Sequence, residues 1–520
     1  MSRPLRRSMA ELHTWTGLLL GWLMFAMFTT GTAAYFQHEI TRWMEPEIVG
    51  RAPNQTVAAE RAVSYLQRTA PGAASWTIAL PDDRRVRTEV RWQPVEEGAP
   101  RETRILDGHG RGAEVRDTRG GYFLYRFHFD LHYLPVLWAR YLVGIAAMSM
   151  LVALVSGIIT HKKIFARFFT LSLGKGLRSW YDAHNITSVF ALPFFLMITY
   201  TGLVTLANQY MPIGGLANYS DMGAYFAELF PRPQTSEAEG EAAEPAPIGG
   251  ILQRARGLWN GAEVETITIQ HPGDAGARVD VRRSRASTVG TRAPTLSFDG
   301  VTGEPLAAAA RGGGAYAAES VLVGIHAGRF ASVGLRWMYV LSGLFGVAMV
   351  GTGLVQWTAR RRTRLPDPGR PNFGFWLVER LNIGAIAGLG AGLAAYFLAN
   401  RLLPQGLPAR AEWEVHCLFI VWGLSTLWAL LRPAARAWPE TLSAAALLYA
   451  AVPVVNGLST PRGLVPSLAA GDWVFVSFDL VMVLLAAVYA GAARVAARKA
   501  APSPRTAPAD IAGLATGTGG

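Results

Sequence analysis

The stretch AELHTWTGLLLGWLMFAMFTTG, residues 10–31, decides the fold of this chain. It is long and apolar enough to cross a bilayer, because a spanning helix needs about 20 apolar residues. It also carries His13 near its charged end, and an ionisable group in a membrane span is costly and usually functional. The stretch DAHNITSVFALPFFLMITYTG, residues 182–202, repeats the pattern with His184 in the equivalent place.

The composition is that of a polytopic membrane protein. Hydrophobic residues make up 51% of the 520-residue chain and charged residues 17%, which is too apolar for an ordinary soluble protein. We therefore predict a mainly α-helical fold with about eight transmembrane helices. The predicted spans lie near residues 12–36, 134–160, 183–207, 333–358, 376–400, 411–431, 440–457 and 473–492.

The net charge of +12 does not indicate a nucleic-acid partner, because the basic residues gather in the loops at one end of the predicted spans. Such clusters mark the cytoplasmic side of a membrane protein. We expect a multi-pass protein of the bacterial inner (plasma) membrane, embedded in the lipid bilayer with both termini cytoplasmic. The clusters include Arg3, Arg6, Arg7, Lys162, Lys163, Arg167, the run ARRRTR at 359–364, and Arg498.

Two long polar segments separate the early spans, and each has the pattern of a small α+β domain on the opposite side of the membrane. Each begins with a helical pattern and continues with alternating runs such as ASWTIALP and EVETITIQHP, which are typical of strands. The predicted division is a first span in 1–37, an outer domain in 38–131, a second span in 132–160, a basic loop in 161–182, a third span in 183–207, a second outer domain in 208–325 with a disordered linker at 231–246, a fourth span in 326–358, a basic loop in 359–375, a four-helix membrane region in 376–495, and a disordered tail in 496–520.

The first four spans form an internal repeat. His13 precedes Gly31 by 18 residues, and His184 precedes Gly202 by 18. Arg140 precedes Gly157 by 17 residues, as Arg336 precedes Gly353. The unit of helix, outer domain and helix is thus used twice in the same orientation. A parallel repeat relates its halves by an axis along the membrane normal.

Histidines that correspond across such an axis can face each other. His13 and His184 lie at the cytoplasmic ends of their spans, an arrangement that suits the two axial positions of one haem iron. A second pair is predicted at the outer face from His132 and His326, with His128 as the alternative to His132. His161 lies near the level of His13 and is a further candidate there.

Two arginines add to this prediction. Arg140 and Arg336 lie about two helical turns inside the second histidine pair. An arginine near the end of a span can simply reach the interface. Because the guanidinium fork also suits carboxylates, these two residues are candidates for binding haem propionates. No cluster of Cys and His has the spacing of a copper or zinc site.

Several blocks resemble the PepSY-associated transmembrane family. They include LHTWTGLLLGW, LHYLPVLWARYLVG, DAHNITSVFALPFFLMITYTGL and, as the most specific match, HKKIFARFFTLSLGKGLRSWYDAHN. The resemblance covers roughly residues 8–362, and the rest is similar to the four-helix tail of longer members. The outer domains resemble PepSY modules.

This resemblance implies an inner-membrane oxidoreductase that reduces ferric siderophores at the periplasmic face. His13, His132, His184 and His326 would be the axial ligands of two b-type haems. The implied partners are a ferric siderophore and an unidentified cytoplasmic electron donor. Two alternatives remain: a transporter of the siderophore or iron, and a non-enzymatic anchor that presents PepSY domains to a protein partner.

Overall fold

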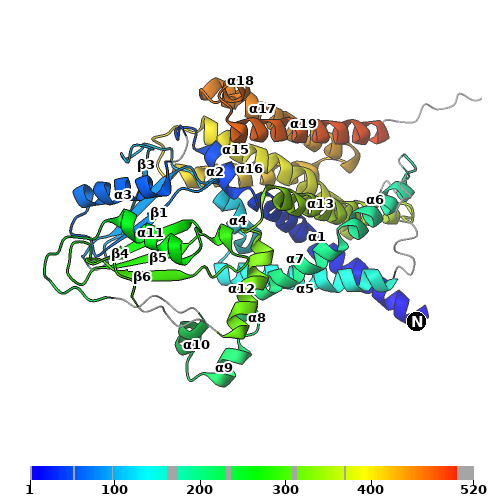
Figure 1. Cartoon of the computed structure of the whole chain (residues 1–520). Coiled ribbons are helices and arrows are strands. Elements are labelled where there is room, and N and C mark those ends of the chain that lie inside the picture. The colour runs from blue at the N-terminus through cyan, green and yellow to red at the C-terminus, as the bar shows by residue number, and fades with distance from the viewer. Residues whose placement is uncertain are drawn as a thin grey trace, which may run out of the picture.

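The computed structural model describes residues 3–50, 53–96, 98–160, 172, 174–229, 236–306, 313–367 and 370–500. Long helices form a bundle, and a β-sheet covered by two helices lies at one end of it (Figure 1). The N-terminal end of α1 lies at the opposite end of the bundle (Figure 1). We call this opposite end, where Arg6, Arg178 and Arg360 lie, the basic end.

The bundle contains the spans that the hydrophobic runs predicted. Within the described residues, seven helical segments are long and apolar enough to cross a membrane, and a bent pair of helices brings the number to eight. The seven are α1 (Arg3–Ala34), α5 (Val136–Thr160), α13 (Val333–Arg362), the segment Phe373–Leu402, α16 (Arg410–Leu431), α17 (Ala434–Ser459) and α19 (Trp473–Ala500).

The third predicted span is the bent pair. It consists of α6 (Leu177–Phe190) and α7 (Leu192–Thr205), which meet at an angle of 66°. Pro193 stands in the first turn of α7, where its missing N–H removes a hydrogen bond to the preceding turn. The helix therefore breaks at Ala191.

The sheet has six antiparallel strands in the order β3-β2-β1-β4-β5-β6. The first polar segment supplies β1 (Ser75–Ala79), β2 (Thr88–Gln93) and β3 (Glu102–Leu106), and the second supplies β4 (Val264–Gln270), β5 (Arg278–Arg283) and β6 (Thr295–Asp299). The pairing of β1 with β4 joins them. The sequence patterns predicted one short sheet in each segment, whereas the structure has one continuous sheet.

One face of the sheet carries α3 (Gln55–Thr69) and α11 (Ile248–Leu258). Ile78 and Ile267, opposite each other across the β1–β4 seam, are fully buried in the shared core beneath these helices. Gln55 ties the segments together: it donates to the carbonyl of Val264 (2.8 Å) and accepts from its N–H (3.2 Å). The two segments therefore share one hydrophobic core.

Short helices connect the sheet to the bundle. They are α2 (Gln37–Met44), α4 (Gly120–Asp130), α8 (Ala207–Tyr210), α9 (Ile213–Asn218), α10 (Met222–Leu229) and α12 (Gly314–Ala327), with a 3-10 turn at Arg285–Ser287. Helices α4 and α12 end just before α5 and α13 begin.

Two predicted disordered segments differ in the structure. Residues 236–246 of the predicted linker lie along the β4–β5 turn, where Asp274 accepts from the N–H groups of Glu239 and Gly240, both at 2.8 Å. Residues 230–235 lie outside the described residues. Helix α19 continues to Ala500, so the start of the predicted tail is helical, and 501–520 again lie outside the described residues.

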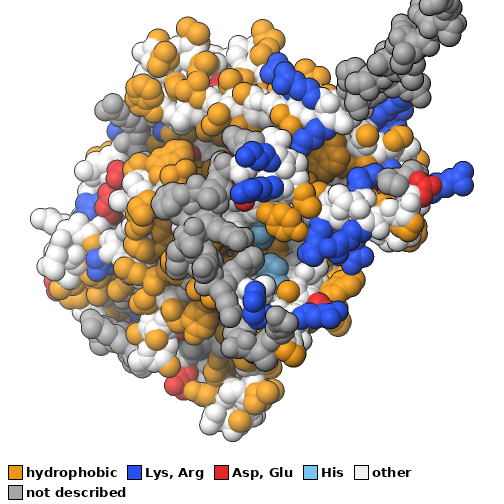
Figure 2. All heavy atoms as spheres, turned by 90° about the vertical axis from the view of Figure 1, so that its right-hand side faces the viewer, with side chains coloured by type: hydrophobic (Ala, Val, Ile, Leu, Met, Phe, Trp, Pro, Cys, Tyr) orange, Lys and Arg blue, Asp and Glu red, His pale blue; other side chains and the backbone are white. Residues whose placement is uncertain are grey.

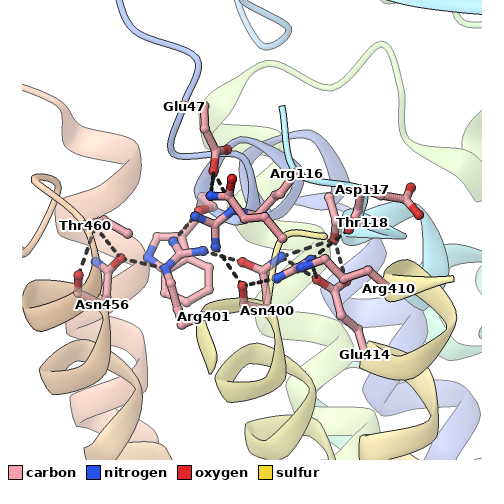
Figure 3. Close-up of polar contacts among 12 residues, drawn as sticks. Glu47, Arg116, Asp117, Thr118, Asn400, Arg401, Arg410, Glu414, Asn456 and Thr460 are labelled. Carbon is pink, nitrogen blue, oxygen red and sulfur yellow. Dashed lines mark hydrogen bonds and ion pairs between the residues drawn. The ribbon is translucent and has the colours of Figure 1, made fainter. Parts of the chain in front are cut away.

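The C-terminal region packs around a buried central helix. This helix runs as α14 (Phe373–Ile383), a π-helical turn (Gly384–Gly388) and α15 (Leu389–Leu402), and α18 (Leu464–Ala469) connects α17 to α19. Figure 3 shows a polar network at its sheet end. There Glu414 accepts from Thr118 (2.6 Å) and Asn400 (2.7 Å), and Arg410 donates to the carbonyl of Asp117 (2.7 Å). The network fastens this region to the segment that precedes α4.

The seam between β1 and β4 is testable by cross-linking. Thr77 and Thr268 are directly opposed. Leu80 N donates to Glu265 O and His271 N donates to Ala74 O. Hydrogen-bonded and non-hydrogen-bonded pairs alternate along an antiparallel ladder, so Thr77 and Thr268 form a non-hydrogen-bonded pair. The Cα atoms of such pairs lie about 4.5 Å apart, within disulfide reach. We expect a Cys417→Ser protein with Thr77→Cys and Thr268→Cys to form this disulfide, detected by mass spectrometry of non-reduced peptides.

The matched control carries Thr77→Cys with Gln270→Cys, a pair offset by two residues. Offset pairs lie about 7–8 Å apart, beyond the reach of a disulfide. Equal cross-linking in both proteins would show that the two segments do not share this register.

Candidate functional site

The first predicted histidine pair is present. His13 on α1 and His184 on α6 face each other with their ring centres 6.3 Å apart and their planes at 73°. The two residues occupy corresponding places in the two repeated halves, because each lies 18 residues before a glycine. The sequence repeat thus brings these two rings together at the basic end of the bundle.

A cavity of about 1280 Å³ surrounds this pair. It extends from Met24 and Met150, inside the bundle, to arginines at the basic end. Figure 2 views that end and shows histidine side chains in a hollow between basic side chains. Pockets for drug-sized ligands are typically about 300–1,000 Å³, so this cavity has room for a macrocycle.

The second pair differs from the prediction. His326 on α12 faces His128 on α4, with ring centres 6.2 Å apart and planes at 32°. The expected partner, His132, lies elsewhere: its ring stacks on Phe419 at 5.7 Å, and its Nε2 lies 3.9 Å from Glu412. The structure therefore pairs His326 with the alternative residue, His128.

The turn between α4 and α5 explains this difference. Leu131 ends α4 in the left-handed conformation, with φ of 50°, and His132 follows with φ of 48°. Two successive left-handed residues reverse the chain direction. His132 therefore lies in the turn, while His128 stays on the helix and faces the bundle. The spacing from histidine to the following arginine gave no preference. His326 precedes Arg336 by 10 residues, whereas His128 and His132 precede Arg140 by 12 and 8.

All four paired rings make the same kind of hydrogen bond. The Nδ1 atom of each ring contacts a backbone carbonyl on a neighbouring helix. A carbonyl only accepts, so each Nδ1 carries the proton and donates it. Each Nε2 then carries the lone pair, which is the form that binds a metal. The acceptors are Ala153 O for His13 (2.8 Å), Met27 O for His128 (2.7 Å), Met349 O for His184 (2.9 Å) and Ile198 O for His326 (3.0 Å).

All four rings also lie against a glycine. In every case the glycine stands four residues after the acceptor carbonyl, one helical turn further along. A Cβ atom at any of these positions would lie closer to the ring than ordinary van der Waals contact allows. The distances from that Cβ to the ring are 3.3 Å for Gly157 and His13, 2.7 Å for Gly31 and His128, 3.1 Å for Gly353 and His184, and 2.9 Å for Gly202 and His326.

The ring separations match two ligands on one metal ion. A metal–nitrogen bond of about 2 Å on each side, plus roughly 1 Å from each nitrogen to its ring centre, separates trans imidazoles by about 6 Å. The observed separations are 6.3 Å and 6.2 Å. Among the described residues no group of three or more His, Cys, Asp or Glu side chains is arranged to hold a metal ion. A metal at either pair would therefore need equatorial ligands of its own.

The two predicted arginines have carboxylate partners within the protein. Arg140 pairs with Asp130 at 2.9 Å, and Arg336 pairs with Glu39 at 3.1 Å. Burial acts to raise the pKa of Glu39, but hydrogen bonds from Arg84 and the charges of Arg84 and Arg336 lower it below its usual value. Glu39 is thus an anionic partner for Arg336. His161 lies outside the described residues.

The acceptor carbonyls were missed by sequence reasoning, although a signal for them was present. Each of the four glycines follows a Ser or Thr: Thr30, Ser156, Thr201 and Thr352. Their hydroxyls donate to carbonyls within their own helices, at 2.6–3.1 Å. At these four positions, a hydroxyl residue followed by glycine marks where a ring packs.

These features define a multi-pass helical membrane protein with two histidine pairs formed between its repeated halves. The family model of the PepSY-associated TM region matches residues 10–360, and the chain belongs to this family. The matched range contains all four paired histidines and their glycines. No curated protein matches the chain significantly.

The contact between ring and glycine predicts a stability difference. Replacing Gly353 with Leu places a side chain where the ring of His184 lies, and such overpacking costs about 1–3 kcal/mol. We expect the purified variant to unfold at a lower temperature than the natural protein. The matched control is Gly423→Leu on α16, where a Cβ meets nothing within 4 Å. An equal melting temperature for the two variants would contradict the packing.

Proposed function

We propose that this protein holds two b-type haems, one at each histidine pair, and carries electrons across the membrane to ferric iron bound by a siderophore. The observation that carries the proposal is the fourfold arrangement of the histidines. Each ring donates from Nδ1 to a helix carbonyl, and the rings are paired at 6.3 Å and 6.2 Å. Such pairs fit the two axial positions of a haem iron.

The donor set favours haem over a bare metal ion. A structural zinc site takes four protein ligands, and a catalytic zinc site takes three. Each pair here offers two imidazoles, so the porphyrin would supply the remaining four positions. The cavity around His13 and His184 also has the size for it, at about 1280 Å³. His13 and His184 would hold one haem, and His128 and His326 the other.

When bound at such a pair, haem supplies a one-electron carrier whose iron alternates between Fe(III) and Fe(II). The chain supplies fixed ligands and a dry space between the pairs. His13 and Met27, the residue that holds His128, are 14 residues apart on α1, which is about 21 Å. Buried Met24, Met150 and Phe195 lie along the helices between the two levels.

The direction of transfer follows from the charges. Basic residues flank the spans at the end opposite the sheet, and such clusters stay on the cytoplasmic side. In the proposed orientation, the sheet lies in the periplasm of a bacterial inner membrane. A cytoplasmic donor would give electrons near His13 and His184, and they would leave near His128 and His326.

Siderophore iron is a substrate that suits this exit. Siderophores bind Fe(III) through hard oxygen donors, whereas the larger and softer Fe(II) is held less tightly. One electron therefore releases the metal, and the donor loses one electron for each iron reduced. The transporter and anchor alternatives give no role to four histidines held in one tautomer.

His128 near the end of α4 and His132 in the turn that follows give a matched test of haem binding. We expect His128→Ala to lose about half of the haem of the purified protein, because it removes one of two axial ligands at one of two sites. His132→Ala, four residues away, should keep all of it. His184→Ala should also lose half, and His128→Ala with His184→Ala nearly all. The pyridine haemochrome absorbance per protein measures this. A colourless natural protein, or equal haem content in His128→Ala and His132→Ala, would contradict the assignment.

Electron delivery is tested by mixing. Protein reduced with dithionite and freed of excess reductant should be reoxidised by ferric siderophore complexes, with one Fe(II) formed for each haem oxidised. Stopped-flow absorbance at the reduced α-band and Fe(II) capture by ferrozine give the two quantities. The gallium complex of the same siderophore is the control, since Ga(III) accepts no electron here. Oxidation at the same rate by the gallium complex would exclude iron reduction as the cause.

A further inference from the structure

Three arginines line the cavity that holds His13 and His184. They come from three helices: Arg6 from α1, Arg178 from α6 and Arg360 from α13. All three residues are exposed, as expected at the mouth of the cavity. The view of the basic end shows basic side chains around the hollow (Figure 2). Two of them have long polar contacts: Arg6 donates to Thr160 O at 3.3 Å, and Arg178 lies 3.9 Å from Asp182.

The charges of this lining do not balance. Asp182 is the one carboxylate among the described lining residues, and it also accepts from the N–H of Ser172 at 3.0 Å. Three guanidinium groups against one carboxylate leave two positive charges without compensation in the described lining. The cavity therefore suits a ligand that brings two negative charges to its mouth.

Each half of the repeat places an arginine at this mouth, a few residues before its histidine. Arg6 lies seven residues before His13, and Arg178 lies six before His184. Seven residues are close to two helical turns, so Arg6 stands on the side of α1 that carries His13, about 10 Å nearer the basic end. Arg178 lies about 9 Å nearer the basic end than His184 and lines the cavity from a neighbouring side of α6. A ligand held between the two histidines would meet one arginine from each half.

We infer that Arg6 and Arg178, assisted by Arg360, bind the two propionates of the haem held by His13 and His184. This inference rests on the proposed function. The propionates leave one edge of the macrocycle, and carboxylates are costly inside a bilayer, so that edge faces the mouth. Guanidinium groups bind carboxylates with two parallel hydrogen bonds. Arg140 and Arg336, in contrast, already pair with Asp130 and Glu39.

The test uses a double variant that carries both Arg6→Gln and Arg178→Gln. Its control is the single variant Arg7→Gln. Arg7 is adjacent, exposed and paired with Glu11, and it does not line the cavity. We expect the double variant to release the haem of the His13–His184 pair to an apo-globin scavenger roughly tenfold faster, since charge-assisted hydrogen bonds are lost. Its midpoint potential should fall, because fewer nearby positive charges favour Fe(III).

Two comparisons make the result decisive. The signal of the other haem, which is the one that His128→Ala lacks, should keep its midpoint potential in the double variant. An unchanged potential there shows that the double variant is folded. Arg6→Lys with Arg178→Lys should restore the potential, because the charge is kept, while release stays fast because the fork is lost. A double Gln variant that matches Arg7→Gln in both measurements would overturn the inference. That result would leave the proposed haem at this pair intact, whereas natural protein without haem there would refute the proposed function itself.

Discussion

The hydrogen bond from each histidine Nδ1 to a helix carbonyl sets the geometry on which the rest of the structure depends. The carbonyl already accepts from within its helix, and its second lone pair takes the ring N–H. The ring reaches it because the residue one turn further on is a glycine, as at Gly157 beside His13. The net contribution of such a hydrogen bond to the free energy of unfolding is about 1 kcal/mol. Its larger effect is on the ring itself, because the bond fixes the tautomer and leaves Nε2 with the lone pair.

The C-terminal helices brace the elements that carry these rings. Tyr396 on the buried α15 donates to the carbonyl of Gly120 (2.8 Å), the first residue of α4, which carries His128. Asn382, on the same central helix, accepts from Trp22 on α1 (2.8 Å) and donates to Leu354 O on α13 (3.1 Å). The region that the sequence left without a role thus touches both repeated halves.

The polar network at the sheet end adds to this bracing (Figure 3). Arg410 and Glu414 pair while only 1% and 0% of their side chains are exposed. A buried ion pair is more tolerable when its remaining polar atoms find partners. Here Thr118, Asn400 and the carbonyl of Asp117 bind the pair, and Nε of Arg410 is left without a partner among the described residues. These partners precede α4, so the network fixes where that helix begins.

The sequence predicted the parts of the structure that follow from local pattern. Hydrophobic runs located the spans and alternation located the strands. The spacing from histidine to glycine singled out His13 and His184, and the position before Arg336 singled out His326. The structure places His128, and not the expected His132, opposite His326, because the left-handed residue Leu131 ends the helix before His132. The joined sheet was missed because the alternating pattern of a strand such as β1 is the same whichever strand it pairs with. Which partner it meets depends on how the two segments are placed, and no local pattern carries that information.

The placement of the halves also bears on electron transfer. Each half donates one histidine to each pair and one edge strand to the seam, so the halves are joined at the sheet, at His128 and His326, and at His13 and His184. A relative movement of the halves would stretch both pairs and shear the shared core around Ile78 and Ile267. A carrier that changes only its oxidation state gains from ligands that stay in place, since less rearrangement accompanies each electron. The seam and the two histidine pairs would give the proposed carrier that rigidity, whereas a transporter that alternates between two openings would have to break these contacts in every cycle.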